Sequence, residues 1–438
     1  MESSLFALIL TICIMTLVLC GWYCCEHLDY FLEKSYTINN VFNNDDDTIP
    51  DIDLIITEEK PNNIKMLDKV VGNLGNSKVD FYINKNKSNS FELKIPSYSN
   101  YNFNGKGLVI AANGIRYRYI TGVYMNIYVI RNLYKSDIPV EIVYVGEDEA
   151  FNTLMKNELL NLGNVKLIDL TERLNTNVKK NKLIGYRTKP LAVIASSFEE
   201  VVLMDADALS FVDPYYFFKL DGYINNGMVL YKDYVTCLHY INKKFINNIG
   251  IGSKTYCKKT HGYELDSSCV VVNKQKAWEA LYTICVINVE SDSYYNNKIN
   301  NVLGDKDTWL IGSMFVGFEP YVSESDPGLL LAYEKDGMEI VLGHLQSQKV
   351  KNEDNIPLYY NNQAIDLSVY NGMDNWGYLE GDIKDPLMFK KWNKSYKKVT
   401  QQMKKTFYTA SIGLEEILPL INTEKPKPNK NMIVKNLI

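Results

Sequence analysis

The chain of 438 residues is long enough for one large domain with accessory segments or for two domains of ordinary size. Hydrophobic residues make up 46% of it and charged residues 23%, which are globular values and exclude a chain too polar to form a core. The formal net charge of -5 offers no broad basic surface, so we expect no nucleic-acid partner.

The first feature in chain order is an apolar run over residues 5–24 that has no charged side chain. About 20 apolar residues cross a bilayer core of ~30 Å as a helix, so the run predicts one transmembrane span after a short tail, residues 1–4. A cleaved signal peptide or a buried helix is the alternative, but the run lacks the basic n-region and the small-residue cleavage site of a signal peptide.

Residues 25–104 are rich in Asn, Asp, Ser and Lys and have few periodic apolar runs, which predicts a stem. Within it, FELKIPSY from Phe91 has the composition of a strand that joins the domain. The sequons at Asn86 and Asn393 fit a lumenal location but are short enough to arise by chance.

Four of the eight cysteines lie in the predicted globular part: Cys237, Cys257, Cys269 and Cys285. In a lumenal domain they can form two disulfides in one of three connectivities. The alternative is a set of reduced, half-buried thiols, and the sequence leaves both interpretations open.

An alternation of strand and helix patterns begins at Gly105. The short apolar runs GLVIAA, PVEIVYV, VKLIDL and VVLMD are typical of buried strands, and helical patterns cover residues 119–133 and PLAVIASSFEE. This alternation predicts an α/β domain with a largely parallel central sheet. In such sheets ligands bind beyond the carboxyl ends of the strands.

Asp205 and Asp207 follow the strand VVLMD on either side of Ala206. A buried carboxylate is costly unless it is paired or bound to a metal, so two of them need a partner. Hard oxygen ligands at a strand end suit Mn²⁺ or Mg²⁺ shared with a diphosphate, whereas the alternative is a solvated turn.

The stretch KPLAVIASSFEEVVLMDADALSFVDPYYFF resembles the signature of the fungal α-1,3-mannosyltransferases, glycosyltransferase family 71. The likeness continues in order through GLVIAANGIRYRY, IPVEIVYVGEDE, ELDSSCVVVNKQKAWEA, GDKDTWLIGSMFVG, GHLQSQ and PLYYNNQ. It implies a GT-A-type nucleotide-sugar-binding core at residues 105–365, followed by a C-terminal extension at 366–438. It also implies a single-pass type II Golgi membrane protein whose lumenal domain uses GDP-mannose and Mn²⁺ to add mannose, with retention, to mannose-terminated glycans of glycoproteins.

The resemblance assigns a donor site to residues from two loops and the strand end: Asn113, Gly114, Arg116, Lys189 and Asp205. Glycine lets a backbone approach the ligand, and arginine can meet phosphate or ribose. In the alternative interpretation Arg116 and Lys189 are ordinary surface residues.

The resemblance also places His344 of GHLQSQ in the metal shell with Asp205 and Asp207, since a neutral imidazole is a competent ligand. A structural histidine is the alternative.

Three further carboxylates match positions that line the sugar pocket and are candidate catalytic groups: Asp266, Asp305 and Asp307. Such a group can stabilise oxocarbenium-like charge, orient the acceptor hydroxyl or act as nucleophile, so same-face and double displacement both remain open. The alternative is solvated loop charge.

One departure from the family pattern concerns Ser268 and Cys269, which stand in Asp-Ser-Ser-Cys where the family has Glu-Ser-Gly-Gln. The change leaves a different specificity or a reduced activity open. The expected function is α-1,3-mannosyl transfer. The alternatives are an α-1,2-mannosyltransferase, another retaining hexosyltransferase of related fold, and a catalytically silent glycan-binding paralogue.

Overall fold

The computed structural model describes residues 54–58, 78–82, 84–85, 91–289, 302–333, 339–349, 355–361, 376–380 and 397–423. The expected transmembrane run at residues 5–24, most of the expected stem and both sequon asparagines lie outside these ranges. Within them, no helix combines the length and the apolar character that a membrane span requires.

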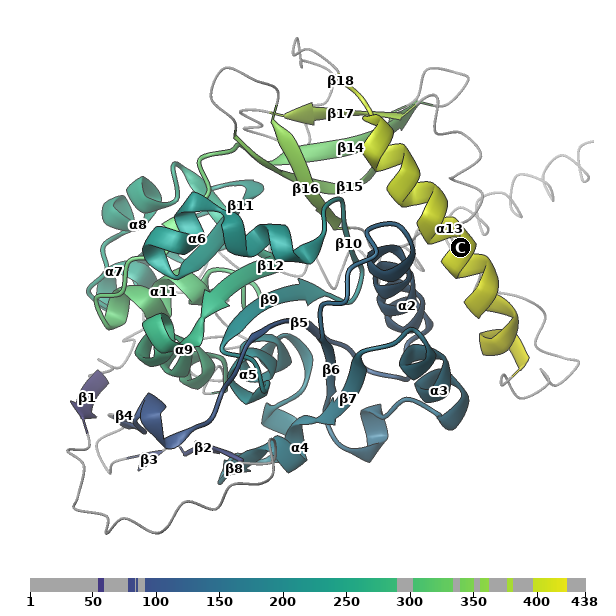
Figure 1. Ribbon diagram of the computed structural model, residues 1–438. Coiled ribbons are helices and arrows are strands. Elements are labelled where there is room, and N and C mark those ends of the chain that lie inside the picture. Colours follow the sequence, from purple (N-terminus) through teal and green to yellow (C-terminus); the bar gives the residue numbers. More distant parts are fainter. Residues whose placement is uncertain are drawn as a thin grey trace, which may run out of the picture. The chain divides into compact units, whose positions relative to one another are not determined.

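A seven-stranded sheet has the order β13-β11-β12-β9-β5-β6-β7 (Figure 1). Its strands in chain order are β5 (Lys106–Ala111), β6 (Val140–Tyr144), β7 (Val165–Asp169), β9 (Glu200–Asp205), β11 (Met228–Thr236), β12 (Tyr263–Asn273) and β13 (Tyr321–Val322). Strand β12 pairs antiparallel with both of its neighbours, and the other pairs in this sheet are parallel. The prediction of an α/β domain with a largely parallel sheet is therefore confirmed.

Helices cover both faces of this sheet, because successive strand residues point to opposite faces and both sets are apolar. Leu108 and Ile110 of β5 belong to one core, together with α2 (Tyr117–Asn132), α3 (Thr153–Asn161) and α13 (Gln401–Thr423). Val109 between them belongs to the other core, together with α5 (Thr188–Ala195), α9 (Lys274–Val289) and α11 (Thr308–Phe315). The short helices α4, α6, α7 and α8 span Leu170–Arg173, Asp221–Asn226, Lys243–Asn248 and Ser253–Lys259.

A second, antiparallel sheet of six strands has the order β10-β16-β15-β14-β17-β18. Its strands are β10 (Ala208–Ser210), β14 (Gly328–Tyr333), β15 (Glu339–Gln348), β16 (Ile356–Asn361), β17 (Trp376–Glu380) and β18 (Lys397–Lys398). Only Ala206 and Asp207 lie between the end of β9 in the first sheet and the start of β10 in the second. The Asp-Ala-Asp motif is therefore the junction of the two sheets.

The packed domain extends beyond residues 105–365 at both ends. Strand β2 (Val79–Phe81) pairs with β8 (Leu174–Thr176), and Val79 and Phe81 are buried in the core. Strand β4 (Phe91–Ile95) pairs with β1 (Leu54–Glu58) and β3 (Asn84–Lys85), as the strand pattern in FELKIPSY indicates. At the other end, α13 lies against α2 and buries Met403 and Phe407 (Figure 1). The segments outside residues 105–365 are polar on average, so their composition does not indicate the few apolar residues that pack into the core.

Candidate functional site

The carboxyl ends of β5 and β9 lie side by side, because Ala111 pairs with Asp205. From β5 the chain continues to β6 on one side, whereas β9 lies on the other side, so the strand order switches direction here. Open α/β sheets bind ligands at such a switch point. A Cβ on Gly122 of α2 would come within 2.2 Å of the Ala206 carbonyl oxygen, so glycine lets this helix pass against the Asp-Ala-Asp turn.

Lys189 connects two of the predicted carboxylates. It lies in the first turn of α5, where Pro190 is tolerated because that N–H has no helical partner. Its ammonium nitrogen is 2.8 Å from Asp205 Oδ1 and 3.3 Å from Asp305 Oδ1, and it donates to Ser267 Oγ at 3.0 Å. The side chain is 11% exposed, so the surface interpretation of Lys189 is wrong.

Burial and charge act against each other in this group, which we call the Lys189 cluster (Lys189, Asp205 and Asp305). Burial raises the pKa of Asp205 to about 7 against the opposing charge of Lys189, and Asp207 and Asp305 add to the rise. Burial by itself would lower the pKa of Lys189, but Asp205 and Asp305 outweigh it and raise the pKa. Lys189 therefore stays charged, and the carboxylates around it carry more negative charge than this one ammonium group offsets.

Asp207 pairs with Arg118 of α2, a residue for which we predicted no role. The Arg118 Nε atom is buried and has no hydrogen-bond partner among the described residues. The sequence contains Arg116 and Arg118 two residues apart in RYR, and only the orientation of the helix distinguishes them. Arg116 is exposed, and its guanidinium lies 5.8 Å from the Tyr119 ring centroid.

The turn that contains Asn113 and Gly114 is held by local contacts. Asn113 Oδ1 accepts a hydrogen bond from the Arg116 N–H at 3.1 Å, and the Gly114 N–H donates to the Glu149 carbonyl at 2.7 Å. A Cβ on Gly114 would come within 2.4 Å of Phe151 Cα, so close backbone packing already requires this glycine. Their donor contacts stay a prediction.

Asp266 of β12 is buried beside the Lys189 cluster, and its charge contributes to the raised pKa of Lys189. Its carboxylate accepts from the Ser268 N–H at 2.9 Å, the Ser268 hydroxyl at 2.6 Å and the Tyr359 hydroxyl at 3.2 Å. Ser268, one of the two departures from the family pattern, therefore orients this carboxylate. The other, Cys269, is buried in the core on the α2 side.

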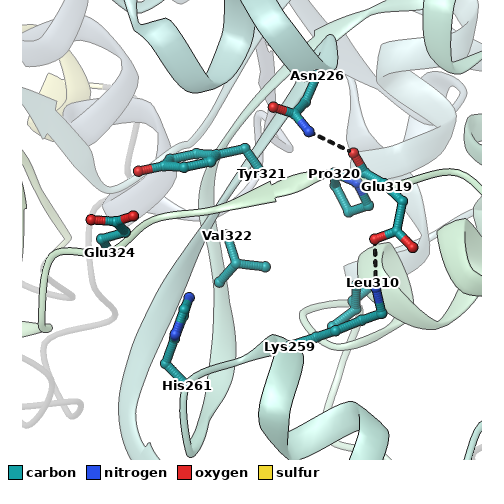
Figure 2. A pocket seen from close by; sticks show the side chains of 9 residues that line it. All are labelled: Asn226, Lys259, His261, Leu310, Glu319, Pro320, Tyr321, Val322 and Glu324. Atoms are coloured by element: carbon teal, nitrogen blue, oxygen red, sulfur yellow. Dashed lines mark hydrogen bonds and ion pairs between the residues drawn. The ribbon is translucent and has the colours of Figure 1, made fainter.

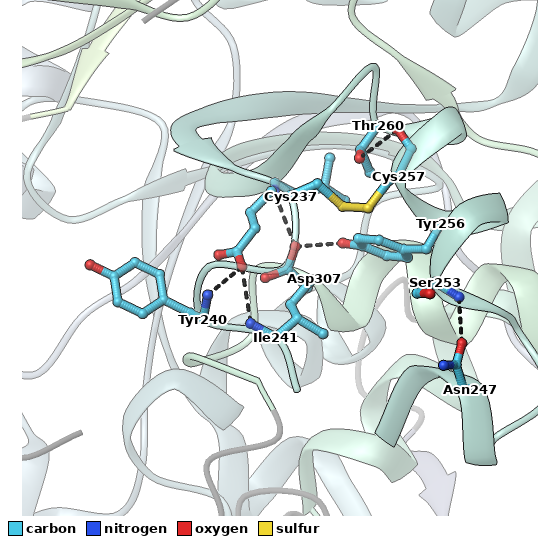
Figure 3. Close-up of a disulfide and its surroundings, with 11 residues drawn as sticks. Cys237, Tyr240, Ile241, Asn247, Ser253, Tyr256, Cys257, Thr260 and Asp307 are labelled. Atoms are coloured by element: carbon cyan, nitrogen blue, oxygen red, sulfur yellow. Dashed lines mark hydrogen bonds between the residues drawn. A yellow bond between two sulfur atoms is a disulfide. The ribbon is translucent and has the colours of Figure 1, made fainter. Parts of the chain in front are cut away.

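Asp307 belongs to a different network from Asp305, because the intervening Lys306 separates their side chains. Asp307 Oδ1 accepts from the Tyr256 hydroxyl at 2.5 Å and from the Leu265 N–H at 3.0 Å. Burial raises the pKa of Asp307 to about 7 against the opposing charge of Lys306. The structure thus brings Asp266 and Asp305 toward Lys189, and holds Asp307 in this second network (Figure 3).

Lys306 is the centre of that second network and was not predicted. Its ammonium nitrogen is 2.8 Å from both Asp233 Oδ2 and Glu264 Oε2. Glu264 in turn accepts from the backbone N–H groups of Tyr240 and Ile241, at 2.6 and 3.0 Å. Burial disfavours the charged form of Asp233, but Lys306 and His344 outweigh it and lower its pKa.

His344 lies on β15, and its ring centroid is 4.3 Å from that of Tyr234. No group of three or more His, Cys, Asp or Glu side chains within the described ranges is arranged to hold a metal ion. Asp205, Asp207 and His344 are therefore not gathered into one shell, and the metal role of His344 stays a prediction. A site built from two carboxylates still fits Mn²⁺ or Mg²⁺, which take their remaining ligands from water and substrate phosphates.

The four cysteines of the globular part form neither two disulfides nor a set of four reduced thiols. Cys237 and Cys257 form a disulfide that joins the end of β11 to α8 (Figure 3), whereas Cys269 and Cys285 are free and buried. Cys257 directly follows Tyr256, so the disulfide supports the donor to Asp307.

Figure 2 shows a pocket of 240 Å³. Its lining is Asn226, Lys259, His261, Leu310, Glu319, Pro320, Tyr321, Val322 and Glu324. Lys259 and Glu319 form an ion pair at 2.5 Å on one side of it. None of the residues predicted to bind a donor or a metal lines this pocket.

Comparison with known proteins supports the sequence resemblance. Residues 105–256 match a family model described as "Mannosyltransferase putative". The α-1,3-mannosyltransferase MNT3 of Saccharomyces cerevisiae is 25% identical over 232 residues, which cover 45% of this chain and 36% of that protein. The α-1,2-mannosyltransferase MNN2 of the same organism is 22% identical over 268 residues, covering 54% of this chain and 44% of that protein.

The chain thus spans less than half the length of these two relatives. Among solved structures, core-mannan synthase A (CmsA/Ktr4) of Aspergillus fumigatus in its Mn/GDP form is 11% identical, with a TM-score of 0.30 over 50% of this chain and 72% of that chain. The family match and the curated relatives confirm the predicted resemblance to the fungal mannosyltransferases.

Proposed function

We propose that this chain is a glycosyltransferase of the GT-A type that transfers mannose from GDP-mannose to a mannose-terminated glycan, in α-1,3 linkage and with retention. The observation that carries the proposal is the convergence of Lys189, Asp205 and Asp305 with the Asp207–Arg118 pair at the switch point of the sheet. Buried carboxylates with surplus negative charge suit a cation, and a buried arginine donor suits an anion. A metal-bound diphosphate supplies both.

Asp205 and Asp207 are the residues that would hold the divalent cation, with Mn²⁺ preferred to Mg²⁺ by the family resemblance. When bound, such a cation offsets the negative charge that develops on the departing diphosphate. The unpaired Arg118 N–H lies beside Asp207, where it can donate to a phosphate oxygen.

Asp266 is the carboxylate that this proposal assigns to the sugar side of the reaction. The two hydrogen bonds from Ser268 hold it in one orientation, as electrostatic stabilisation of a positively charged transition state requires. Lys189 keeps Asp205 and Asp305 in place and remains protonated. Same-face displacement and attack by a carboxylate both stay compatible with this arrangement.

The membrane topology is part of the proposal: a type II protein whose catalytic domain faces the Golgi lumen. The apolar run at residues 5–24 supports an anchor, and the Cys237–Cys257 disulfide supports an oxidising compartment. Protease added to sealed Golgi vesicles should leave the domain intact until detergent is added. Digestion without detergent would contradict a lumenal domain.

Turnover of radiolabelled nucleotide sugars by the full-length chain in detergent, on a panel of mannosides, tests the reaction. We expect label from GDP-mannose and not from UDP-galactose or UDP-glucose, and linkage-specific mannosidase digestion of the product identifies the bond. An α-1,2 product is the second candidate, because relatives of both linkages match this chain. GDP binding without transfer to any mannoside would favour the catalytically silent alternative.

A further inference from the structure

One face of the second sheet is turned toward Asp266. Asn361 of β16 pairs with Ala208 on one side and His344 on the other, and Tyr359 pairs with Ser210 and Gln346. Residues paired across neighbouring strands, and residues two apart along a strand, share a face. The face reaches the first sheet where the Tyr359 hydroxyl donates to Asp266 at 3.2 Å.

Gln346 on this face is 1% exposed, and its amide has only one acceptable orientation. Nε2 donates to the Lys232 carbonyl at 2.6 Å and to Asp266 Oδ2 at 3.4 Å. Both partners are acceptors, so a flipped amide would turn its oxygen toward two other oxygens. In the observed orientation Oε1 is buried and finds no donor in the described part of the chain.

The second acceptor without a donor among the described residues belongs to Asn361, which pairs with His344 on the same face. Its Oδ1 atom is buried and also lacks a donor within the described ranges. Its strand neighbour Ala208 directly follows Asp207, so Asn361 lies on the strand next to the end of the Asp-Ala-Asp motif. Buried acceptors of this kind are costly, which makes two of them beside one site an indication of a ligand that donates hydrogen bonds.

Because the Gln346 and Asn361 side-chain oxygens both lack a hydrogen-bond donor in the described part of the chain, a ligand that fits them must supply donors. A diphosphate has acceptor oxygens and no donor at neutral pH, so carbonyl oxygens repel it. A hexose offers several hydroxyl donors. The two amide oxygens therefore suit the sugar part of a nucleotide sugar and not its phosphates.

We propose that Gln346 and Asn361 are specificity-determining residues that accept hydrogen bonds from hydroxyl groups of the transferred hexose. The inference rests on the proposed function, because it assumes a nucleotide-sugar donor whose diphosphate lies at Asp205 and Asp207. It adds that side chains of the antiparallel sheet contact the hexose and determine the specificity for it, whereas the strand ends of the first sheet bind the nucleotide diphosphate.

The test compares GDP-mannose with its four monodeoxy derivatives in the full-length chain, wild type and the variants Asn361→Ala and Gln346→Met. In the wild type we expect at least one deoxy donor to have a kcat/KM about tenfold below that of GDP-mannose. In one of the two variants the same deoxy donor should lower kcat/KM less than twofold relative to GDP-mannose, because that variant has already lost the hydrogen bond in question. GDP affinity, measured by calorimetry with Mn²⁺, should stay within about twofold of wild type in both variants.

Gln348→Met is the matched control. Gln348 lies on the same strand, and its Oε1 is already satisfied by the Tyr216 hydroxyl at 2.6 Å. This variant should lose stability like Gln346→Met and keep the wild-type discrimination among deoxy donors. Retained GDP binding in Asn361→Ala shows that the domain is folded even where Gln346→Met is not.

Two outcomes separate the failure of this inference from that of the proposed function. Wild-type protein that neither binds nor turns over a nucleotide sugar overturns the proposed function, and this inference with it. Wild-type turnover with equal deoxy penalties in wild type and both variants overturns the inference alone, and assigns water to the two amide oxygens.

Discussion

The ammonium nitrogen of Lys189 lies 2.8 Å from Oδ1 of Asp205, and 16 residues separate the two in the chain. The contact joins the first turn of α5 to the carboxyl end of β9. Asp305 Oδ1 lies 3.3 Å from the same ammonium nitrogen. One buried cation thus holds a buried carboxylate, Asp305, and a partly buried one, Asp205, at the switch point of the sheet.

Replacing Lys189 by Met should lower the free energy of unfolding by about 3 kcal/mol, because it leaves Asp205 and Asp305 buried without a counter-charge. Urea unfolding of the full-length protein measures this. Lys219 is exposed, so Lys219→Met is the control and should change the stability little. A Lys189→Met protein as stable as wild type would show that the cluster carries no net electrostatic energy.

Replacing Asp207 by Asn should reduce turnover of GDP-mannose by at least about 100-fold, by analogy with other groups that stabilise developing charge. The melting temperature should change little, because the amide oxygen of Asn can still accept the hydrogen bond from Arg118. Asp221→Asn removes an exposed charge and serves as control. Full wild-type turnover in excess EDTA would eliminate the metal interpretation.

His344→Ala should weaken Mn²⁺ and GDP binding together, by about tenfold each, since the metal carries the charge of the diphosphate. Strand pairing through Asn361 puts His344 two strands from Ala208, about 10 Å across the sheet. Calorimetric titration measures both affinities. His344→Asp should recover part of each, because a carboxylate is also a ligand for Mn²⁺.

A structural His344 predicts the opposite pattern. Its ring packs against Tyr234, so the alanine variant would lose thermal stability and keep both affinities. That result would remove His344 from the metal site.

The stability of the domain should depend on pH through Asp307. Burial raises its pKa from 3.8 to about 7, so between these pH values the folded protein holds a proton that the unfolded chain has released. The free energy of unfolding therefore falls as pH rises through this window, by up to about 1.4 kcal/mol per pH unit, and the contribution is fully present below pH about 4.

Asp307→Asn should reduce the slope of this fall, because the amide keeps the acceptor for Tyr256 and cannot ionise. The part that remains comes from Asp205, because burial also raises the pKa of that carboxyl to about 7. Urea unfolding at a series of pH values from 4 to 7 checks it, with Asp221→Asn as the control. Parallel pH profiles for wild type and Asp307→Asn would show that another group is responsible.

Removing the disulfide by the double change Cys237→Ser and Cys257→Ser should cost about 3 kcal/mol of stability, as expected for a closed loop of this size. A reductant should lower the stability of wild type to that of the double variant and leave the variant unchanged. Alkylation and peptide mapping under denaturing, non-reducing conditions should label Cys269 and Cys285 and leave Cys237 and Cys257 unlabelled. Labelled Cys237 would contradict the pairing.

The sequence by itself predicted the strand and helix alternation from Gly105, the largely parallel sheet and the carboxylate motif at a strand end. These features follow from local rules: the period of apolar residues reports secondary structure, and an apolar run that ends in Asp-x-Asp places charge at the rim of a sheet. The outer limits of the domain were less accessible, because anchors such as Phe81 and Phe407 are single apolar residues in polar segments.

Only the tertiary structure decided which partner each charge has. Arg118 meets Asp207 across 89 residues, Gln346 meets Asp266 across 80, and Lys306 separates Asp305 from Asp307 although all three are consecutive. Such pairings depend on how two sheets and a helix pack, and neither periodicity nor composition encodes those distances. The sequence could therefore predict the carboxylates of the site, whereas the fold determined their cationic partners and left two buried amide oxygens without donors among the described residues.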